Sequence, residues 1–171
     1  MVDVREMHTA DIEAVSRIRV RGWQAADAGI VPRTYSDAMT VERDANQRRQ
    51  WWSEPGRQSR DLVALGDWDP GGWICFGPRR RELPGAEPVG EIFALHVSPD
   101  LVGQASAAGS LEEAHERMKS QSFQASTLWV LADNQRTRRF DERADHQADG
   151  TPQDDAYDEI TLTELHYQRV L

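Results

Sequence analysis

Hydrophobic and polar residues alternate along the chain with two different periods, and each period predicts a type of element. Ile12, Val15 and Ile18 recur at the spacing of an amphipathic helix, and Thr9 is suited to cap its start. The polar run TVERDANQRRQWW, residues 40–52, is rich in helix-forming residues and predicts a second helix. The first half of the chain therefore contributes two helices before its main strands.

Shorter apolar or alternating runs predict β-strands. They are VDVREM, DLVALGD, GGWICFGP, PVGEIFALHV, STLWVL and LTELHYQRV. Helical patterns follow the fourth run, ending near Ser120, and the fifth, in NQRTRRFDERA. The predicted order is βααβββαβαβ, in which the central strand–helix–strand passage implies two parallel strands in an otherwise mixed sheet. The polar stretch ADGTPQDDAYDE, residues 148–159, is predicted to be one long loop, with a short strand near HQADG as an addition.

Length and charge limit the class of protein. The chain has 171 residues and a formal net charge of −9, which suits a single domain over residues 1–171. An acidic surface repels phosphate backbones, so we expect no nucleic-acid partner and favour cationic or amine-bearing ones. No secretory signal or membrane-spanning run is visible, which predicts a cytoplasmic protein without membrane contact. A homodimer is compatible with the sequence.

Several residues whose side chains could serve catalysis or metal binding have ordinary structural explanations. The single Cys75 lies in a strand-like run and is predicted to be a small core residue. The cluster GPRRRE, residues 77–82, is predicted to be a solvated hairpin tip. His115 is placed at the edge of an apolar helix stripe and lacks neighbouring metal ligands, so no metal site is predicted. Trp51, Trp52, Trp68, Trp73 and Trp129 are expected to serve packing.

Three segments together resemble the GNAT superfamily of acyl-CoA-dependent N-acetyltransferases over nearly the whole chain. They are IRVRGWQAADAGIVP, GEIFALHVSPDLVGQ and TLWVLADNQRTRRFDERA. The resemblance implies an α/β fold of the α+β type. Its mixed, mostly antiparallel sheet would have six to seven strands, about four flanking helices and a splayed pair formed by the fourth and fifth strands.

The resemblance also implies acetyl-CoA as cofactor. In the family, the pantetheine arm pairs with backbone that a bulge frees between the splayed strands; that edge corresponds to Leu95, His96 and Val97. The pyrophosphate lies on a loop of small residues at a helix N-terminus. The loop and the contact that follows it correspond to Gly103, Gln104, Ala105, Ala107 and Asn134. Asn134 is equally suited to cap the helix after it.

That loop departs from the family pattern of Gln or Arg, two residues, Gly, one residue, then Gly or Ala. Val102 replaces the Gln or Arg, and Ala105 replaces the glycine. A register shifted by two residues, with Gln104, Ala107 and Gly109, matches better but lengthens the loop. The sequence therefore predicts a degenerate pyrophosphate loop.

Catalytic roles follow from the same resemblance. Glu91 stands where many members place a carboxylate that acts as base through water; the alternative is a solvated strand residue. Asp141 replaces the tyrosine that protonates the leaving thiolate, and Asp145 replaces a glycine. A carboxylate of ordinary pKa is ionised at pH 7 and would repel the thiolate. Transfer would then depend on water as the acid, at a cost of roughly 10²–10⁴-fold.

Acceptor specificity is assigned to the loop after the first helix, where Trp23, Asp27 and Tyr35 would line a pocket. An acid at position 27 suits a cationic amine, although a solvated loop aspartate is an equal alternative. The leading hypothesis is acetyl transfer to a small primary amine. The alternatives are a GNAT-fold enzyme without acetyl-CoA, in which Glu91, His96 and Asp141 supply acid–base groups, and a non-catalytic member that binds a ligand.

Overall fold

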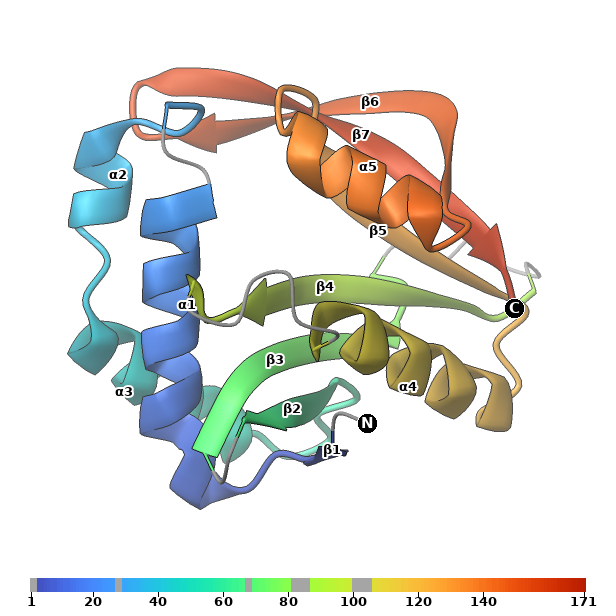
Figure 1. Ribbon diagram of the computed structural model, residues 1–171, viewed down its shortest axis with the longest axis horizontal. Helices are drawn as coiled ribbons and strands as arrows, with labels where there is room; N and C mark the ends of the chain where they lie inside the picture. The colour runs from blue at the N-terminus through green and yellow to red at the C-terminus, as the bar shows by residue number, and fades with distance from the viewer. Residues whose placement is uncertain (1–2, 27–28, 67–68, 81–86, 100–105) are drawn as a thin grey trace.

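The computed structural model describes residues 3–26, 29–66, 69–80, 87–99 and 106–171. Its seven strands form one sheet in the order β1-β2-β3-β4-β5-β7-β6 (Figure 1). They are β1 (Asp3–Glu6), β2 (Arg60–Gly66), β3 (Asp69–Pro78), β4 (Val89–Val97), β5 (Ala125–Leu131), β6 (Gln147–Tyr157) and β7 (Ile160–Val170). All neighbours are antiparallel except β4 and β5, which are parallel. The predicted fold class and parallel pair are confirmed.

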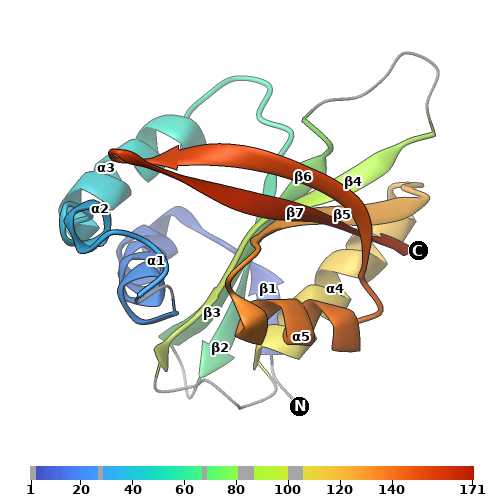
Figure 2. The same cartoon turned by 90° about the horizontal axis from the view of Figure 1, so that it is seen from above.

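Helices cover both faces of the sheet (Figure 2). They are the 3-10 helix η1 (Thr9–Asp11), α1 (Ile12–Ala26), α2 (Arg33–Asp37), α3 (Val41–Trp52), α4 (Ser106–Ser120) and α5 (Gln135–Arg143). On one face, α1 and α3 pack around Val15, Val63 and Trp73. On the other, α4 packs Leu111 and Met118 against the strands. Each face is closed by burial of apolar side chains, the main favourable term in folding.

Helix starts follow the capping rules, with one correction. The Thr40 hydroxyl accepts a hydrogen bond from the Arg43 amide at 3.2 Å, as expected for the cap of α3. Thr9 does not cap the first helix, because it lies inside η1, and His8 is the N-cap residue. The Asp11 carboxylate accepts from the His8 amide at 2.7 Å. The prediction for Thr9 was therefore wrong by one residue.

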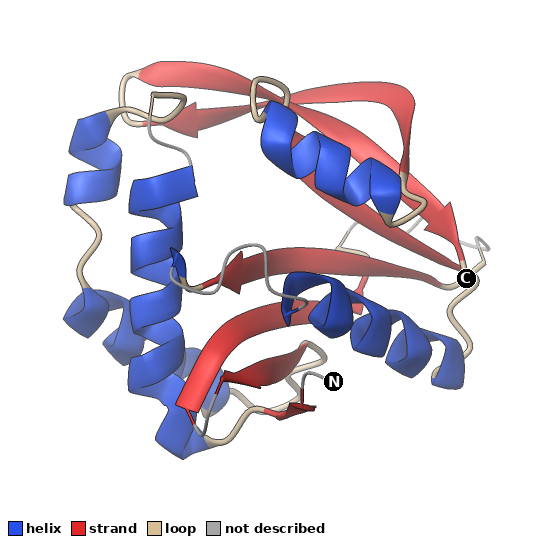
Figure 3. Cartoon of the chain, viewed as in Figure 1, coloured by secondary structure: helices blue, strands red, loops and turns tan. Residues whose placement is uncertain are grey.

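The polar stretch from residue 148 to 159 is not a loop. Most of it belongs to β6, an eleven-residue edge strand paired with β7 (Figure 3). Its side chains are almost all exposed, so neither face needs apolar residues, and pairing with β7 supplies the backbone hydrogen bonds. A strand without a buried face leaves no hydrophobic alternation to detect.

None of the described helices is long and apolar enough to cross a membrane.

The strands β4 and β5 separate along their length, as predicted. Their pairing runs from Val89 opposite Ala125 to Ile92 opposite Leu128 and then stops. A register shift in the β3–β4 ladder leaves Phe93 as an additional residue just beyond that point. Such a bulge bends a strand and interrupts its ladder. The rest of β4 therefore diverges from β5 and opens the sheet toward α1 (Figure 1).

Candidate active site

A cavity of about 630 Å³ fills the opening between β4 and β5. Its walls come from the end of α1, the end of β4, the first turn of α4, β5, α5 and the β6–β7 hairpin. Leu95, His96 and Val97 all line it, as do Trp129 and Val130 across the gap. We call this cavity the cleft. It brings together residues that the sequence separates by more than 130 positions, Gly22 and Glu164 among them.

One end of the cleft suits an anion. Ala107 and Ala108 in the first turn of α4 line it, together with Arg136 and Arg143 of α5. A helix N-terminus presents unsatisfied amides and a partial positive charge, and arginine adds full charge. Asn134 also lines the cleft, and its Oδ1 accepts from the Thr137 amide at 3.1 Å, so the predicted capping role is confirmed. The predicted loop residues Gly103, Gln104 and Ala105 lie outside the described residues.

Asp141 lies on α5 and is among the residues that line the cleft. It is 4% exposed, and its Oδ2 has no hydrogen-bond partner within the described part of the chain. Burial raises the pKa of this carboxyl to about 7, with a smaller contribution from Glu142. The expectation of an ordinary pKa was therefore wrong. A substantial fraction of Asp141 is protonated near neutral pH and can donate a proton into the cleft.

His96 ends β4 and is held between α1 and Trp73. Its ring stacks on that of Trp73, with centroids 5.9 Å apart and planes 6° apart. A Cβ at Gly22 would come within 2.7 Å of the His96 Nδ1, so only glycine leaves room for the ring. Burial lowers the pKa of His96 to about 4, and Arg19 and Arg48 lower it further. The imidazole is therefore neutral near pH 7 and does not repel a cationic molecule.

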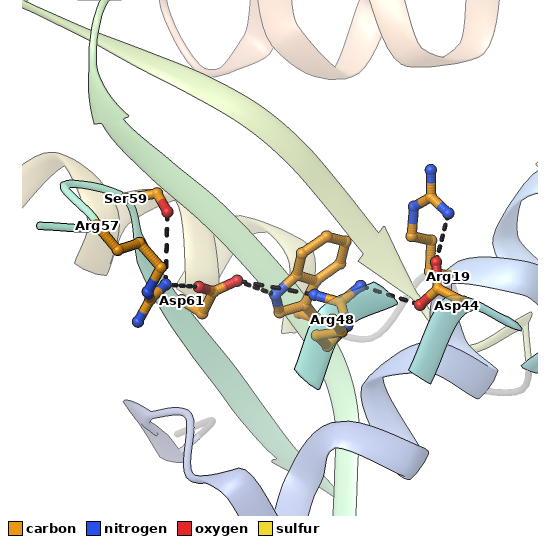
Figure 4. Close-up of polar contacts among 7 residues, drawn as sticks. Arg19, Asp44, Arg48, Arg57, Ser59 and Asp61 are labelled. Carbon is orange, nitrogen blue, oxygen red and sulfur yellow. Dashed lines mark hydrogen bonds and ion pairs between the residues drawn. The ribbon is translucent and has the colours of Figure 1, made fainter. Parts of the chain in front are cut away.

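Behind Trp73, alternating charges form a buried row between α1, α3 and β2 (Figure 4). The Trp73 Nε1 donates to Asp61 at 2.8 Å, and Arg48 lies 4.2 Å from the Trp73 ring centroid. Arg48 also contacts Asp44 at 3.2 Å and Asp61 at 3.9 Å. We call the group the α3 charge network; its members are Arg19, Asp44, Arg48, Arg57 and Asp61. The network fixes Trp73 and, through the stack, the orientation of His96.

The other end of the cleft is aromatic and acidic. Trp23 lies 5.9 Å from Tyr35 and 6.0 Å from Tyr157 between ring centroids. Of the predicted pocket residues, Trp23 lines the cleft, Tyr35 contacts Trp23 but is not among the described residues that line the cleft, and Asp27 falls outside the described residues. Tyr157 lines the cleft as well. Glu164 of β7 also lines this end. Its carboxylate accepts from the Tyr157 hydroxyl at 3.1 Å and from Gln153 Nε2 at 2.7 Å.

Glu164 was not among the residues that the sequence singled out. Its position depends on the β6–β7 hairpin, and β6 had been predicted to be a loop. The available signal was the alternation within LTELHYQRV, which places Leu162, Glu164 and His166 on one face of the strand. Only the pairing of β7 with β5 shows that this face meets the cleft.

Comparisons with known proteins agree with this geometry. The acetyltransferase (GNAT) family model matches residues 23–145. The chain belongs to this family. A search of curated protein sequences found no match. This GNAT chain resembles the PaiA N-acetyltransferase of Thermoplasma acidophilum in complex with coenzyme A, with 17% identity, a TM-score of 0.77 and coverage of 100% of this chain and 99% of that one.

Two further structures have the same fold. The ribosomal-protein-alanine N-acetyltransferase of Brucella melitensis gives a TM-score of 0.79 at 19% identity, covering 99% of each chain. The yncA protein of Salmonella typhimurium, determined with acetyl-CoA, gives 0.72 at 16% identity, covering 100% of this chain and 94% of that one. At these identities the similarity establishes the fold and leaves the acceptor open.

One departure from the GNAT pattern and one open alternative now have a structural answer. Asp145 has a φ of 63°, the left-handed conformation that favours glycine and that aspartate tolerates better than most residues. Glu91 is 3% exposed, so the alternative of a solvated strand residue was wrong. Its carboxylate accepts from the Arg80 amide at 3.1 Å and from Arg80 Nε at 3.0 Å. It lies in the closed part of the β4–β5 pair, and it is not among the described residues that line the cleft.

His115 is also placed differently from the prediction. His115 belongs to α4, and its side chain is fully buried instead of lying at the edge of the apolar stripe. Its Nδ1 accepts a hydrogen bond from Arg169 at 2.8 Å, and its ring centroid is 5.2 Å from that of His146. Burial lowers the pKa of His115 to about 3 and that of His146 to about 4. Both imidazoles are neutral at pH 7. No group of three metal-ligating side chains occurs among residues that the structure describes.

Proposed function

We propose that this GNAT protein is an acyl-CoA-dependent N-acetyltransferase whose acceptor is a small, positively charged primary amine. The observation that carries the proposal is Glu164, a carboxylate at the aromatic end of the cleft. It has hydrogen bonds from Tyr157 and Gln153, but no cationic side chain of the described residues lies within ion-pair distance. An ammonium group would supply the missing positive charge, and the rings of Trp23 and Tyr157 favour a cation nearby.

The residues along the cleft fit acetyl-CoA. Beyond Ile92, the backbone of β4 has no partner in β5, so its amides and carbonyls are available for the amide groups of a pantetheine arm. The first turn of α4 with Arg136 and Arg143 suits a pyrophosphate. Bound there, acetyl-CoA supplies a thioester carbonyl that an amine can attack. The proposal includes a contribution of residues 100–105, the loop that the resemblance assigns to the pyrophosphate, to binding of the cofactor.

Asp141 would complete the chemistry. It lines the cleft, and its raised pKa leaves a substantial fraction of the carboxyl protonated near neutral pH. A neutral carboxylic acid can protonate a departing thiolate, which the missing tyrosine would do in related enzymes. His96, neutral at the rim, would keep positive charge away from the path of the cationic amine.

The test has two stages. Calorimetric titration with acetyl-CoA should show saturable binding, and a thiol-release assay should show turnover with a panel of small diamines and amino sugars. Glu164→Gln should raise KM for the amine by about 10- to 100-fold, since a hydrogen bond to a charged group contributes about 1.5–3 kcal/mol. Binding of acetyl-CoA should stay unchanged. Glu159→Gln, at an exposed position of the same hairpin, is the matched control.

The result that would contradict the proposal is equally definite. If no acyl-CoA binds at millimolar concentration, the cleft has been reassigned. The protein is then a GNAT-fold member that uses other chemistry or only binds a ligand.

A further inference from the structure

Strand β6 bulges at one position, opposite His166. Ala148 pairs with Tyr167 and Pro152 pairs with Leu165, so residues 149–151 of β6 all face His166 of β7. Gly150 has a φ of 84°, and the Asp149 Oδ1 accepts from the Thr151 amide at 2.9 Å. This turn directs the second oxygen of Asp149 to the His166 Nδ1, at 2.6 Å. Bulges commonly redirect a side chain beside an active site.

His166 lies level with the opening of the cleft. It pairs with Trp129 of β5, the first residue beyond the last paired position, Leu128 opposite Ile92. The rings of Trp129 and His166 are in contact, with centroids 4.8 Å apart, and Trp129 lines the cleft. Glu164 lies two residues away on the same face of β7. His166 itself is not among the described residues that line the cleft, and it adjoins the cleft through the ring of Trp129. An amine held at Glu164 would have to pass the edge of the Trp129 ring to reach His166.

His166 differs from His96, His115 and His146 in having a carboxylate hydrogen-bonded to one ring nitrogen. In His96, His115 and His146, burial lowers the pKa to about 4, 3 and 4, which makes each a poor proton acceptor. The His166 side chain is 12% exposed and carries a carboxylate partner on Nδ1. A carboxylate at Nδ1 places the ring proton there and leaves the Nε2 lone pair free to accept another. It also stabilises the imidazolium that results.

We propose that His166 is the catalytic base that takes a proton from the acceptor ammonium, and that Asp149 is its positioning residue. The inference rests on the proposed function. One proton passes from the ammonium to the His166 Nε2, and the freed lone pair forms the nitrogen–carbon bond to the acetyl group. The carbon–sulfur bond breaks, its electron pair stays on sulfur, and Asp141 supplies that sulfur with a proton. The second proton of the attacking nitrogen is released to solvent, and the Asp141 carboxylate regains a proton from solvent.

Among the described residues, Asp149 from β6 is hydrogen-bonded to His166, Glu164 lies two residues along the same strand, and β5 presents the uncharged Trp129. The Asp149 carboxylate therefore orients the ring.

The experiment measures kcat/KM against pH for the amine that the wild-type protein acetylates best. His166→Gln should lower kcat/KM by about 10²–10⁴-fold and abolish the acidic limb, while acetyl-CoA binding is kept. Added imidazole should restore part of the activity in His166→Ala. The control His8→Gln changes an exposed histidine outside the cleft. In Asp149→Asn the ring is retained but loses the carboxylate that orients it, so kcat should fall while KM for the amine stays unchanged.

These readouts distinguish a base from a structural cross-strand pair. A folded His166→Gln protein with unchanged kcat/KM and an unchanged pH profile would overturn the assignment while leaving acetyl transfer intact. If His166→Gln does not fold, Asp149→Asn decides: an unchanged kcat in the folded variant overturns the assignment. Absence of wild-type turnover with every amine, despite acetyl-CoA binding, would instead remove the proposed function and this inference together.

Discussion

Two buried groups of polar side chains lie on opposite faces of the sheet and handle charge in opposite ways. Under α1 and α3, the α3 charge network gives each carboxylate, Asp44 and Asp61, at least one arginine within 3.2 Å. Under α4 and α5, the group is Asp141, His115 and His146. Each of these three has one buried nitrogen or oxygen without a hydrogen-bond partner among the described residues. The first group is charged and paired, and the second is neutral.

The difference separates stability from chemistry. In the first group, a partner of opposite charge offsets part of the cost of burying each charge. Groups without an oppositely charged partner stay buried by favouring the neutral form. The pKa of Asp141 rises to about 7, and those of His115 and His146 fall to about 3 and 4. The paired network therefore holds His96 in place from behind. The neutral group responds to pH beside the cleft.

Breaking the charged group should have the largest effect. Arg48→Met leaves Asp44 and Asp61 buried with less compensation, and it removes the cation over Trp73. We expect the free energy of unfolding to fall by about 3–5 kcal/mol, measured by urea denaturation. Arg49→Met is the matched control, since Arg49 is the next residue on α3 and pairs with Glu13 at the surface. Its loss should stay below about 1 kcal/mol. Equal losses of unfolding free energy in both variants would show that the α3 charge network contributes no more to stability than a surface ion pair.

The neutral group can be tested through Asp141. Because its folded-state pKa lies above the unfolded value near 4, the folded chain binds an extra proton between these pH values, and stability falls as pH rises from about 4 to 7. Asp141→Asn removes this cost, so it should stabilise the protein by up to about 2–4 kcal/mol at pH 8 and have little effect at pH 4. Asp145→Asn, at an exposed neighbour, should show no such pH dependence. A destabilised Asp141→Asn protein at pH 8 would contradict the assigned pKa.

Sequence patterns predicted the elements with a buried face well, because burial there demands apolar residues. The runs in β2 to β5 each bury at least one face, and α1 and α4 show clear apolar stripes. Strand β6 escaped prediction because pairing with β7, not burial, stabilises it. Helix α2, five residues long, follows Pro32, and no helix was predicted there.

The candidate site was only partly predictable for related reasons. Leu95, His96 and Asp141 could be placed from their motifs, and all three line the cleft. The pKa of Asp141 could not be predicted, since it depends on burial by elements distant in sequence. Glu164 and His166 were missed because their neighbours across β5 and β6 are set by strand order. A residue's type can be read locally, but the charge it carries is a property of the assembled fold.

The two buried histidines should give a smaller effect of opposite sign. Their folded-state pKa values lie below the unfolded value near 6.5, so the unfolded chain binds more protons and stability falls as pH drops from 6.5 toward 4. At pH 5 each costs about 1–2 kcal/mol relative to pH 8. His115→Gln should flatten this part of the stability profile, and His8→Gln should not. Denaturation midpoints across pH 4.5 to 8 measure it, and an unaltered slope in His115→Gln would refute the assignment.

The contact between α1 and His96 should give the smallest change in stability. In Gly22→Ala, the new Cβ would come within 2.7 Å of the His96 Nδ1 and push the ring away from Trp73. Strain of about 1–3 kcal/mol is offset by the higher helix propensity of alanine, about 1 kcal/mol, so the net loss should be about 1 kcal/mol. The displaced ring gains solvent, and its pKa should rise from about 4, which NMR titration can measure. In Gly90→Ala the new Cβ meets the flexible Met118 thioether, also at 2.7 Å, and His96 should titrate as in the wild type. If His96 keeps its pKa in Gly22→Ala, the contact with α1 is not what buries the ring.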